Sequence, residues 1–189
     1  TREVLASASD YADCQVQAVA LTGGMAAHVA DDALGALLRD VRQNFNLAPG
    51  AEIALRARPG MVAAASVDAF RIGHVSRIVM DYATSSLKEW RALDRVLDPG
   101  AMDVTRTVLG ALPECGHGVR LAGCEADFAF DLLVGIPGQT PASARASVEA
   151  ALAYGASEVR LGDCRPAANL AVPASATART PSAEEAEQV

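Results

Sequence analysis

Apolar residues along this chain recur at two spacings, which alternate from segment to segment. The two-residue alternation of Ile53, Leu55 and Ala57 is typical of a strand with one buried face, whereas the repeat that starts with Leu34 and Leu38 is typical of an amphipathic helix. These patterns predict strands at residues 16–21, 52–57, 77–80, 127–134 and 158–161. They predict helices at residues 2–12, 31–45, 66–72, 86–93, 98–112 and 141–154.

Strands that alternate with helices in this way predict a parallel sheet covered by helices, which is the α/β class. The first element is a helix with no strand before it, so we expect that a first strand is missing from the array. Residues 1–165 are interpreted as this α/β unit. Residues 166–189, rich in Ala, Pro and Ser, are interpreted as a connector toward a following helix that starts near Pro181.

One predicted strand carries a carboxylate inside its apolar run. Asp131 lies within Phe128–Val134, and the strand ends in Gly-Ile-Pro-Gly-Gln-Thr, where Thr140 is expected as the N-cap of the next helix. A charged group on an interior strand is costly unless it has a partner or a ligand. Asp131 is therefore the first candidate functional residue, and the alternative is a structural ion pair with Arg77 or Arg95.

Composition and charge argue against several classes of function. The 189 residues carry a net charge of −7 and form no basic stripe, which argues against nucleic-acid binding. No apolar run reaches the roughly 20 residues that cross a bilayer. The four scattered cysteines include no C-x-x-C pair, so reduced thiols in the cytoplasm are the expected state. Cys115, His117 and Cys124 offer three ligands at irregular spacing, and we predict no metal there.

Five short motifs, taken in order, resemble the radical SAM domain of oxygen-independent coproporphyrinogen III oxidase and its haem-chaperone and haem-degrading relatives. The last motif, Asp-Leu-Leu-Val-Gly-Ile-Pro-Gly-Gln-Thr, is the most specific, whereas the others gain weight from their order and spacing. The matching segments are Thr22–Met25, Glu52–Gly60, Arg77–Ala83, Leu93–Arg95 and Asp131–Thr140.

The resemblance implies a partial (β/α) TIM-like barrel with parallel strands and an active site at their C-terminal ends. It also implies S-adenosylmethionine and a [4Fe-4S] cluster as cofactors, the cluster being held by three cysteines spaced C-x-x-x-C-x-x-C. No such run occurs in this chain, so we expect no radical chemistry from the chain as it stands.

Seven residues occupy positions that the family places around the adenosyl cofactor. Arg56 stands where the family has a glutamate, Ala83 where it has a glutamine, and Met25 where it has a threonine. An arginine at position 56 reverses the local charge; it could bind a carboxylate, neutralise Asp81 or Asp131, or face solvent. The cofactor-site positions are Gly23, Gly24, Met25, Arg56, Ala83, Arg95 and Asp131.

Two functions remain open at this point. The chain is expected to be a fragment or divergent member of a coproporphyrinogen oxidase-like radical SAM protein that acts on porphyrin or haem. The alternative is a degenerate, non-catalytic module that binds haem or the cofactor. In addition, the apolar strand at residues 16–21 is expected to form an unpaired sheet edge, which favours self-association.

Overall fold

A computed structural model describes the following residues of the chain: 3, 6, 8–22, 31–62, 70, 72–108, 119–121 and 124–164. The strands are β1 Val16–Leu21, β2 Leu47–Ala57, β3 Arg77–Ala83, β4 Val119–Leu121, β5 Cys124–Val134 and β6 Glu158–Asp163. The helical elements are η1 Ser9–Tyr11, α2 Asp31–Asn44, α4 Leu87–Ala92, α5 Ala101–Val108 and α6 Pro141–Ala153.

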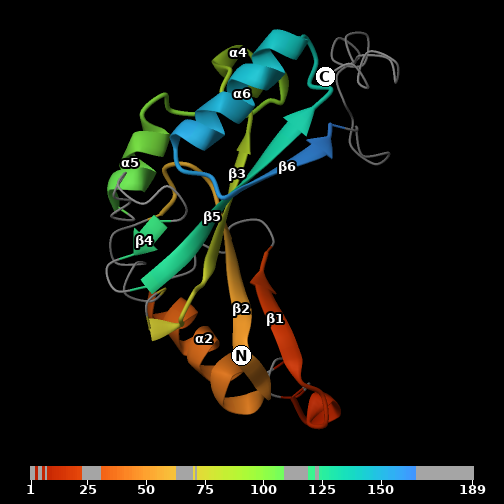
Figure 1. Cartoon of the computed structure of the whole chain (residues 1–189), viewed down its shortest axis with the longest axis vertical. Helices are drawn as coiled ribbons and strands as arrows, with labels where there is room; N and C mark the ends of the chain where they lie inside the picture. Colours follow the sequence, from red (N-terminus) through yellow and green to blue (C-terminus); the bar gives the residue numbers. More distant parts are fainter. Residues whose placement is uncertain are drawn as a thin grey trace.

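Five strands run parallel in the order β1-β2-β3-β5-β6, and they alternate with helices along the chain (Figure 1). The sheet curls into a half-barrel, which confirms the predicted fold class. The short strand β4 is antiparallel to the start of β5. No strand was predicted before residue 127 in this stretch, which was wrong, because residues 119–121 pair with residues 124–126 in an antiparallel arrangement.

The two faces of the sheet differ in chemistry. One face is apolar and packs against the helices; Leu38 of α2, Met102 of α5 and Ala151 of α6 belong to the same core as the strands. The strand residues of this core include Ile53, Leu55, Ile78, Met80, Tyr82, Phe128, Phe130 and Leu132. Because strand side chains alternate between faces, the residues between these positions lie on the other face, where the charged groups gather.

Local capping contacts define the ends of α4 and α6, and the predicted N-cap Thr140 is confirmed. The Ser86 side chain accepts a hydrogen bond from the backbone of Glu89 at the start of α4. Thr140 and Ser143 form a reciprocal capping box at the start of α6, and Pro141 is the first helical residue. Gly155, with φ of +90°, follows the last turn of α6, as expected for a helix that ends in a left-handed residue.

Several sequence predictions are refined or left outside the described residues. The helix expected at 98–112 begins at Ala101 and is described as far as Val108. The segments that carry Gly23, Gly24 and Met25, the loop with Cys115 and His117, and the connector at 166–189 lie outside the described residues. In the part of the chain that the structure describes, β1 pairs only with β2, so the predicted self-association through that edge stays a prediction.

Candidate functional site

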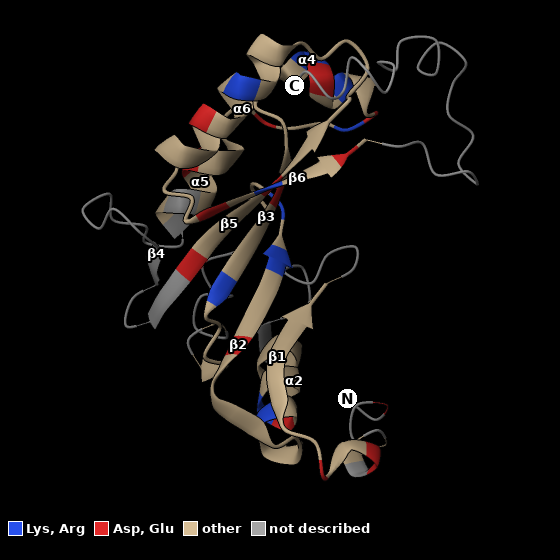
Figure 2. Cartoon of the chain, turned by 45° about the vertical axis from the view of Figure 1, so that its right-hand side comes forward, with Lys and Arg blue, Asp and Glu red and all other residues tan. Residues whose placement is uncertain are grey.

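Charged residues form two layers on the sheet face that the described helices leave uncovered. Figure 2 shows acidic and basic positions following one another along β2, β3 and β5. The C-terminal layer lies toward the C-terminal ends of the strands and consists of Arg56, Arg58, Asp81, Arg95 and Asp131. The N-terminal layer consists of Glu52, Arg77, Asp127, Glu158 and Arg160. Between the layers on the same face lie the small apolar residues Ala54, Val79 and Ala129.

The first contact of the C-terminal layer joins Arg56 and Asp131. A guanidinium N–H of Arg56 donates to the carboxylate of Asp131 and forms an ion pair with it. The Asp131 side chain is 16% exposed, whereas that of Arg56 is 43% exposed. Of the partners considered from the sequence, Arg56 therefore pairs with Asp131, whereas Arg77 and Arg95 do not.

The second contact places two arginines on one aspartate. Arg58 Nε lies 3.3 Å from Asp81 Oδ2, and Arg95 Nη1 lies 3.6 Å from Asp81 Oδ1. Asp81 is the direct neighbour of Asp131 across the pairing of β3 and β5. Arg95 Nη1 is buried and makes no hydrogen bond to any residue that the structure describes. The Asp81 carboxylate is thus shared between two cations, at separations longer than a strong charge-assisted hydrogen bond.

The backbone that ends α4 positions Arg95. Asp94 takes a left-handed conformation, with φ of +54°, and its N–H bonds to the Arg91 carbonyl at 3.1 Å. The N–H of Arg95 bonds to the Trp90 carbonyl at 3.0 Å, which completes a Schellman turn. Trp90 is itself buried and donates its indole N–H to the Thr84 carbonyl. The turn directs Arg95 back toward the end of β3, where Asp81 lies.

Ala83 contributes a backbone kink to this region. It is fully buried at the end of β3, with φ of +56°, and the pairing with β5 shifts between Asp81 and Ala83. A methyl side chain offers no polar group to a ligand, in contrast to the glutamine of the resembled family. The left-handed φ at a residue other than glycine marks local backbone strain at the carboxyl end of the strand.

A hydrogen-bond network lies at the ends of β3 and β5. The Gln139 side-chain oxygen accepts from the N–H of Gly135 at 2.8 Å, and its nitrogen donates to the Leu133 carbonyl at 3.0 Å and to Glu89 at 3.3 Å. Thr84 donates its hydroxyl to the same carboxyl oxygen of buried Glu89 at 2.6 Å. The glutamine of the Gly-Ile-Pro-Gly-Gln-Thr motif therefore holds the turn and connects it to α4.

Two residues near the candidate site were missed from the sequence. Arg58 follows Arg56 by two positions, so strand alternation could have placed both on the charged face. Cys164 lies just beyond β6, where burial raises the pKa of its thiol and the charge of Arg95 partly lowers it. No sequence pattern signals the neighbourhood of Cys164 and Arg95, because it depends on how β6 pairs with β5.

The N-terminal layer is organised around Arg77. Its guanidinium pairs with Glu52 on β2 at 2.8 Å, with Asp127 on β5 at 3.5 Å and with Glu158 on β6. Glu158 also accepts from Arg160, and these contacts lower the pKa of the Glu158 carboxyl. One arginine on a central strand thus connects four strands, which is a structural role rather than that of a ligand contact.

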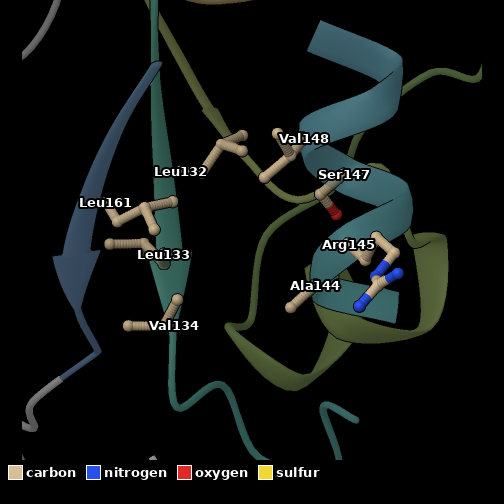
Figure 3. Close-up of a pocket in the computed structure, with 8 residues that line it drawn as sticks. All are labelled: Leu132, Leu133, Val134, Ala144, Arg145, Ser147, Val148 and Leu161. Carbon is tan, nitrogen blue, oxygen red and sulfur yellow. The ribbon is translucent and has the colours of Figure 1, made fainter. Parts of the chain in front are cut away.

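A small hollow lies away from these charged layers. It has a volume of about 210 Å³ and lies between α6 and the β5–β6 edge (Figure 3). It is lined by Leu132, Leu133, Val134, Ala144, Arg145, Ser147, Val148 and Leu161. Its lining is largely apolar and includes none of the four predicted site residues that the structure describes, so we assign it no role in the candidate site.

Comparisons with known proteins agree with this architecture. No protein-family model matches the chain. An oxygen-independent coproporphyrinogen III oxidase from Bradyrhizobium diazoefficiens is 30% identical over 138 residues, which are 73% of this chain and 28% of that protein. The solved coproporphyrinogen III oxidase HemN from Escherichia coli, a radical SAM enzyme, superposes with a TM-score of 0.76 at 18% identity. The chain is thus similar in sequence to part of one coproporphyrinogen III oxidase and similar in fold to part of another.

Two further solved structures, at lower sequence identity, share the fold of this chain. The methyltransferase TsrM from Kitasatospora setae, solved with cobalamin and a [4Fe-4S] cluster, matches 86% of the chain with a TM-score of 0.58 at 12% identity. Archaeal Elp3 from Methanocaldococcus infernus matches 86% with a TM-score of 0.59 at 9% identity. The chain spans 28% of the Bradyrhizobium oxidase and 41% of the Escherichia coli oxidase, and thus corresponds to part of each.

The described residues do not fit the cofactors that the resemblance implies. Both carboxylates of the C-terminal layer are already paired with arginines, which outnumber them by three to two. S-adenosylmethionine carries a sulfonium and an ammonium against one carboxylate, so it is a net cation. The four cysteines of the sequence also lack the cluster spacing, and no three metal-ligating side chains gather within the described ranges.

Along the residues that can be described, no helix combines the length and the apolar character that a bilayer crossing needs. The seven cofactor-site positions fall into two groups, because four lie on the charged face or beside it and three lie outside the described residues. The four are Arg56, Ala83, Arg95 and Asp131.

Proposed function

We propose that this chain forms part of the substrate-facing wall in a coproporphyrinogen oxidase-like protein that acts on porphyrin or haem. The observation that carries the proposal is the C-terminal layer, in which three arginines line one face of a half-barrel at the carboxyl ends of its strands. Ligands of (β/α) barrels bind at this end. Carboxylate-bearing tetrapyrroles are a substrate class that such a cationic wall can bind.

Within this proposal the chain contributes binding rather than radical chemistry. Arg56, Arg58 and Arg95 would hold and orient anionic groups, while the apolar row of Ala54, Val79 and Ala129 would exclude water beneath them. The cofactors that the family uses would have to be held by residues other than the paired carboxylates described above. Radical initiation is what S-adenosylmethionine and the cluster supply in the family.

Direct titration tests the proposed function. Coproporphyrin III and haem are added separately to the chain, and the Soret absorption band is followed. We expect a saturable shift with one porphyrin per chain for at least one of the two. If the Soret absorbance rises linearly with each added compound, as it does in the buffer blank, the proposal is excluded. Anaerobic reconstitution with iron and sulfide is expected to give no stoichiometric [4Fe-4S] spectrum, and such a spectrum would contradict the assignment to binding alone.

A second candidate function is a degenerate module without a catalytic role. The Arg56–Asp131 ion pair favours it, because Asp131 matches a family position near the cofactor and here it is taken by a side chain of the protein. Titration of S-adenosylmethionine into a version of the chain extended at its N-terminus separates the two candidates. Micromolar binding favours a catalytic role, whereas no binding with retained haem affinity favours the module.

A further inference from the structure

The two charged layers differ in which sign of charge is in excess. In the N-terminal layer two arginines face three acidic residues, and Arg77 alone contacts three carboxylates. In the C-terminal layer three arginines face two aspartates. Among the residues that the structure describes, the ion-paired groups of this face are therefore polarised along the strands, with their excess positive charge at the carboxyl ends. Ion pairs that serve only to join strands do not require such an excess.

The donors of the C-terminal layer are only partly used. Each guanidinium offers five N–H groups, and Asp81 has to serve both Arg58 and Arg95. Arg95 Nη1 is buried and has no hydrogen bond among the described residues. The side chains of Arg56, Arg58 and Arg95 are 43%, 37% and 35% exposed, so a ligand can reach each of them, although it cannot reach the buried Arg95 Nη1.

We propose that Arg56, Arg58 and Arg95 form an anion site that binds a carboxylate group and discriminates against the cationic S-adenosylmethionine. A carboxylate accepts paired hydrogen bonds from the planar guanidinium fork, and one added negative charge neutralises this layer. Arg56 determines the sign of the net charge at the site, because it is the one arginine of the three that stands where the resembled family has an acidic residue. Only the identity of the natural ligand, a porphyrin carboxylate, rests on the proposed function.

The anion site is tested with citrate alone, so that the result does not depend on porphyrin binding. The arginine Nε–Hε resonances of the ¹⁵N-labelled chain are followed by NMR during titration with citrate and, separately, with S-adenosylmethionine. We expect saturable shifts of the Arg56, Arg58 and Arg95 resonances with citrate, weakened by added NaCl because salt screens such contacts. S-adenosylmethionine is expected to cause no saturable shift of these three resonances.

Variants separate ligand binding from structural support. Arg58→Gln removes one guanidinium but leaves Arg95 on Asp81, and it is expected to weaken citrate binding about tenfold, as for the loss of a charge-assisted hydrogen bond. Arg56→Glu is expected to abolish citrate binding. Arg39→Gln, at an exposed position on α2, is the matched control and is expected to bind citrate as the parent chain does. The backbone NMR spectrum verifies that each variant is folded.

Three results would overturn the anion site. They are the absence of saturable citrate shifts, equal citrate affinity in the parent and the Arg58→Gln chain, and tighter binding of S-adenosylmethionine than of citrate. A comparison of coproporphyrin III with its tetramethyl ester then addresses the natural ligand. If citrate binds at the arginines but neither porphyrin does, the anion site stands and the proposed function fails. If both porphyrins bind equally and citrate does not bind, the proposed function stands and the anion site fails.

Discussion

Arg56 on β2 and Asp131 on β5 form an ion pair across the intervening strand β3, although 75 positions separate them in the chain. The pair is unequal, because Asp131 is 16% exposed and Arg56 is 43% exposed. Removal of the arginine leaves a largely buried carboxylate without its ion-pair partner. Removal of the aspartate leaves a guanidinium that water can solvate. The ion pair therefore connects β2 and β5 within the candidate site, and we expect it to contribute to the stability of the sheet.

We predict that Arg56→Gln lowers the free energy of unfolding more than Asp131→Asn does. The coupling energy from the double-mutant cycle is expected to be about 1 kcal/mol, at the upper end for partly exposed pairs. Urea unfolding of the two single variants and the double variant measures it. Equal costs for the two single variants, together with a coupling energy near zero, would contradict the assigned ion pair.

The thiol of Cys164 serves as a reporter of the charge on Arg95. Burial raises the pKa of Cys164, and the nearby positive charge of Arg95 acts in the opposite direction. We predict that Arg95→Gln moves the midpoint of Cys164 alkylation by iodoacetamide to higher pH, because the thiolate loses a stabilising cation. Peptide mass spectrometry across a pH series measures the midpoint, and exposed Cys14 in the same digest is the internal reference. A shift to lower pH would place Arg95 elsewhere.

Acid stability depends on the N-terminal layer. Hydrogen bonding to Arg160, and with it the charge of Arg77, lowers the pKa of Glu158 below its ordinary value of 4.5. Glu158 therefore stabilises the fold above that pH, and this contribution is lost as the pH falls through the lowered pKa. We predict that Glu158→Gln reduces the pH dependence of unfolding at acidic pH, by a small amount because the side chain is 39% exposed. Urea midpoints at several acidic pH values test the change.

Much of the fold follows from local patterns in the sequence. Alternation within the strand at Ile53 and Leu55 predicted its buried face, and the cap at Thr140 predicted where α6 begins. These features depend on neighbours within a few residues. The hairpin of β4 was not predicted, because residues 119–121 carry no turn signal that distinguishes a paired strand from a loop.

The partners of the charged residues could not be predicted in the same way. The sequence placed Asp131 in an apolar strand and left Arg56, Arg77 and Arg95 open as its partner. The choice of Arg56 among the three depends on the order β2-β3-β5, on the register that aligns Asp81 with Asp131, and on the turn after α4 that directs Arg95 to Asp81. Each of these is a long-range property that residue types and spacing leave open.

The packing of Gly73 predicts a sharp steric effect. A Cβ atom built on Gly73 would lie 2.3 Å from Leu38 Cδ1, and Leu38 is fully buried on α2. We predict that Gly73→Ala lowers the free energy of unfolding by about 1–3 kcal/mol, the usual cost of overpacking a core. Gly100→Ala is the control, since its Cβ atom would meet only Asp98 Oδ1 at 3.6 Å. Equal stability of the two variants in urea would contradict the prediction, because it would mean that Leu38 and α2 move enough to accept the added methyl group.

Gln139 offers a test of the most specific motif in the chain. Its amide accepts from Gly135 N–H and donates to the Leu133 carbonyl and to Glu89, so a glutamate of the same shape keeps the acceptor and loses both donors. We predict that Gln139→Glu destabilises the chain at neutral pH, because two carboxylates then face each other in a partly buried network. The loss should shrink as the pH falls, since a protonated glutamate can donate again. Gln17→Glu, on an exposed strand position, is the matched control. A destabilisation that stays constant from neutral to acidic pH would contradict the explanation from carboxylate charge.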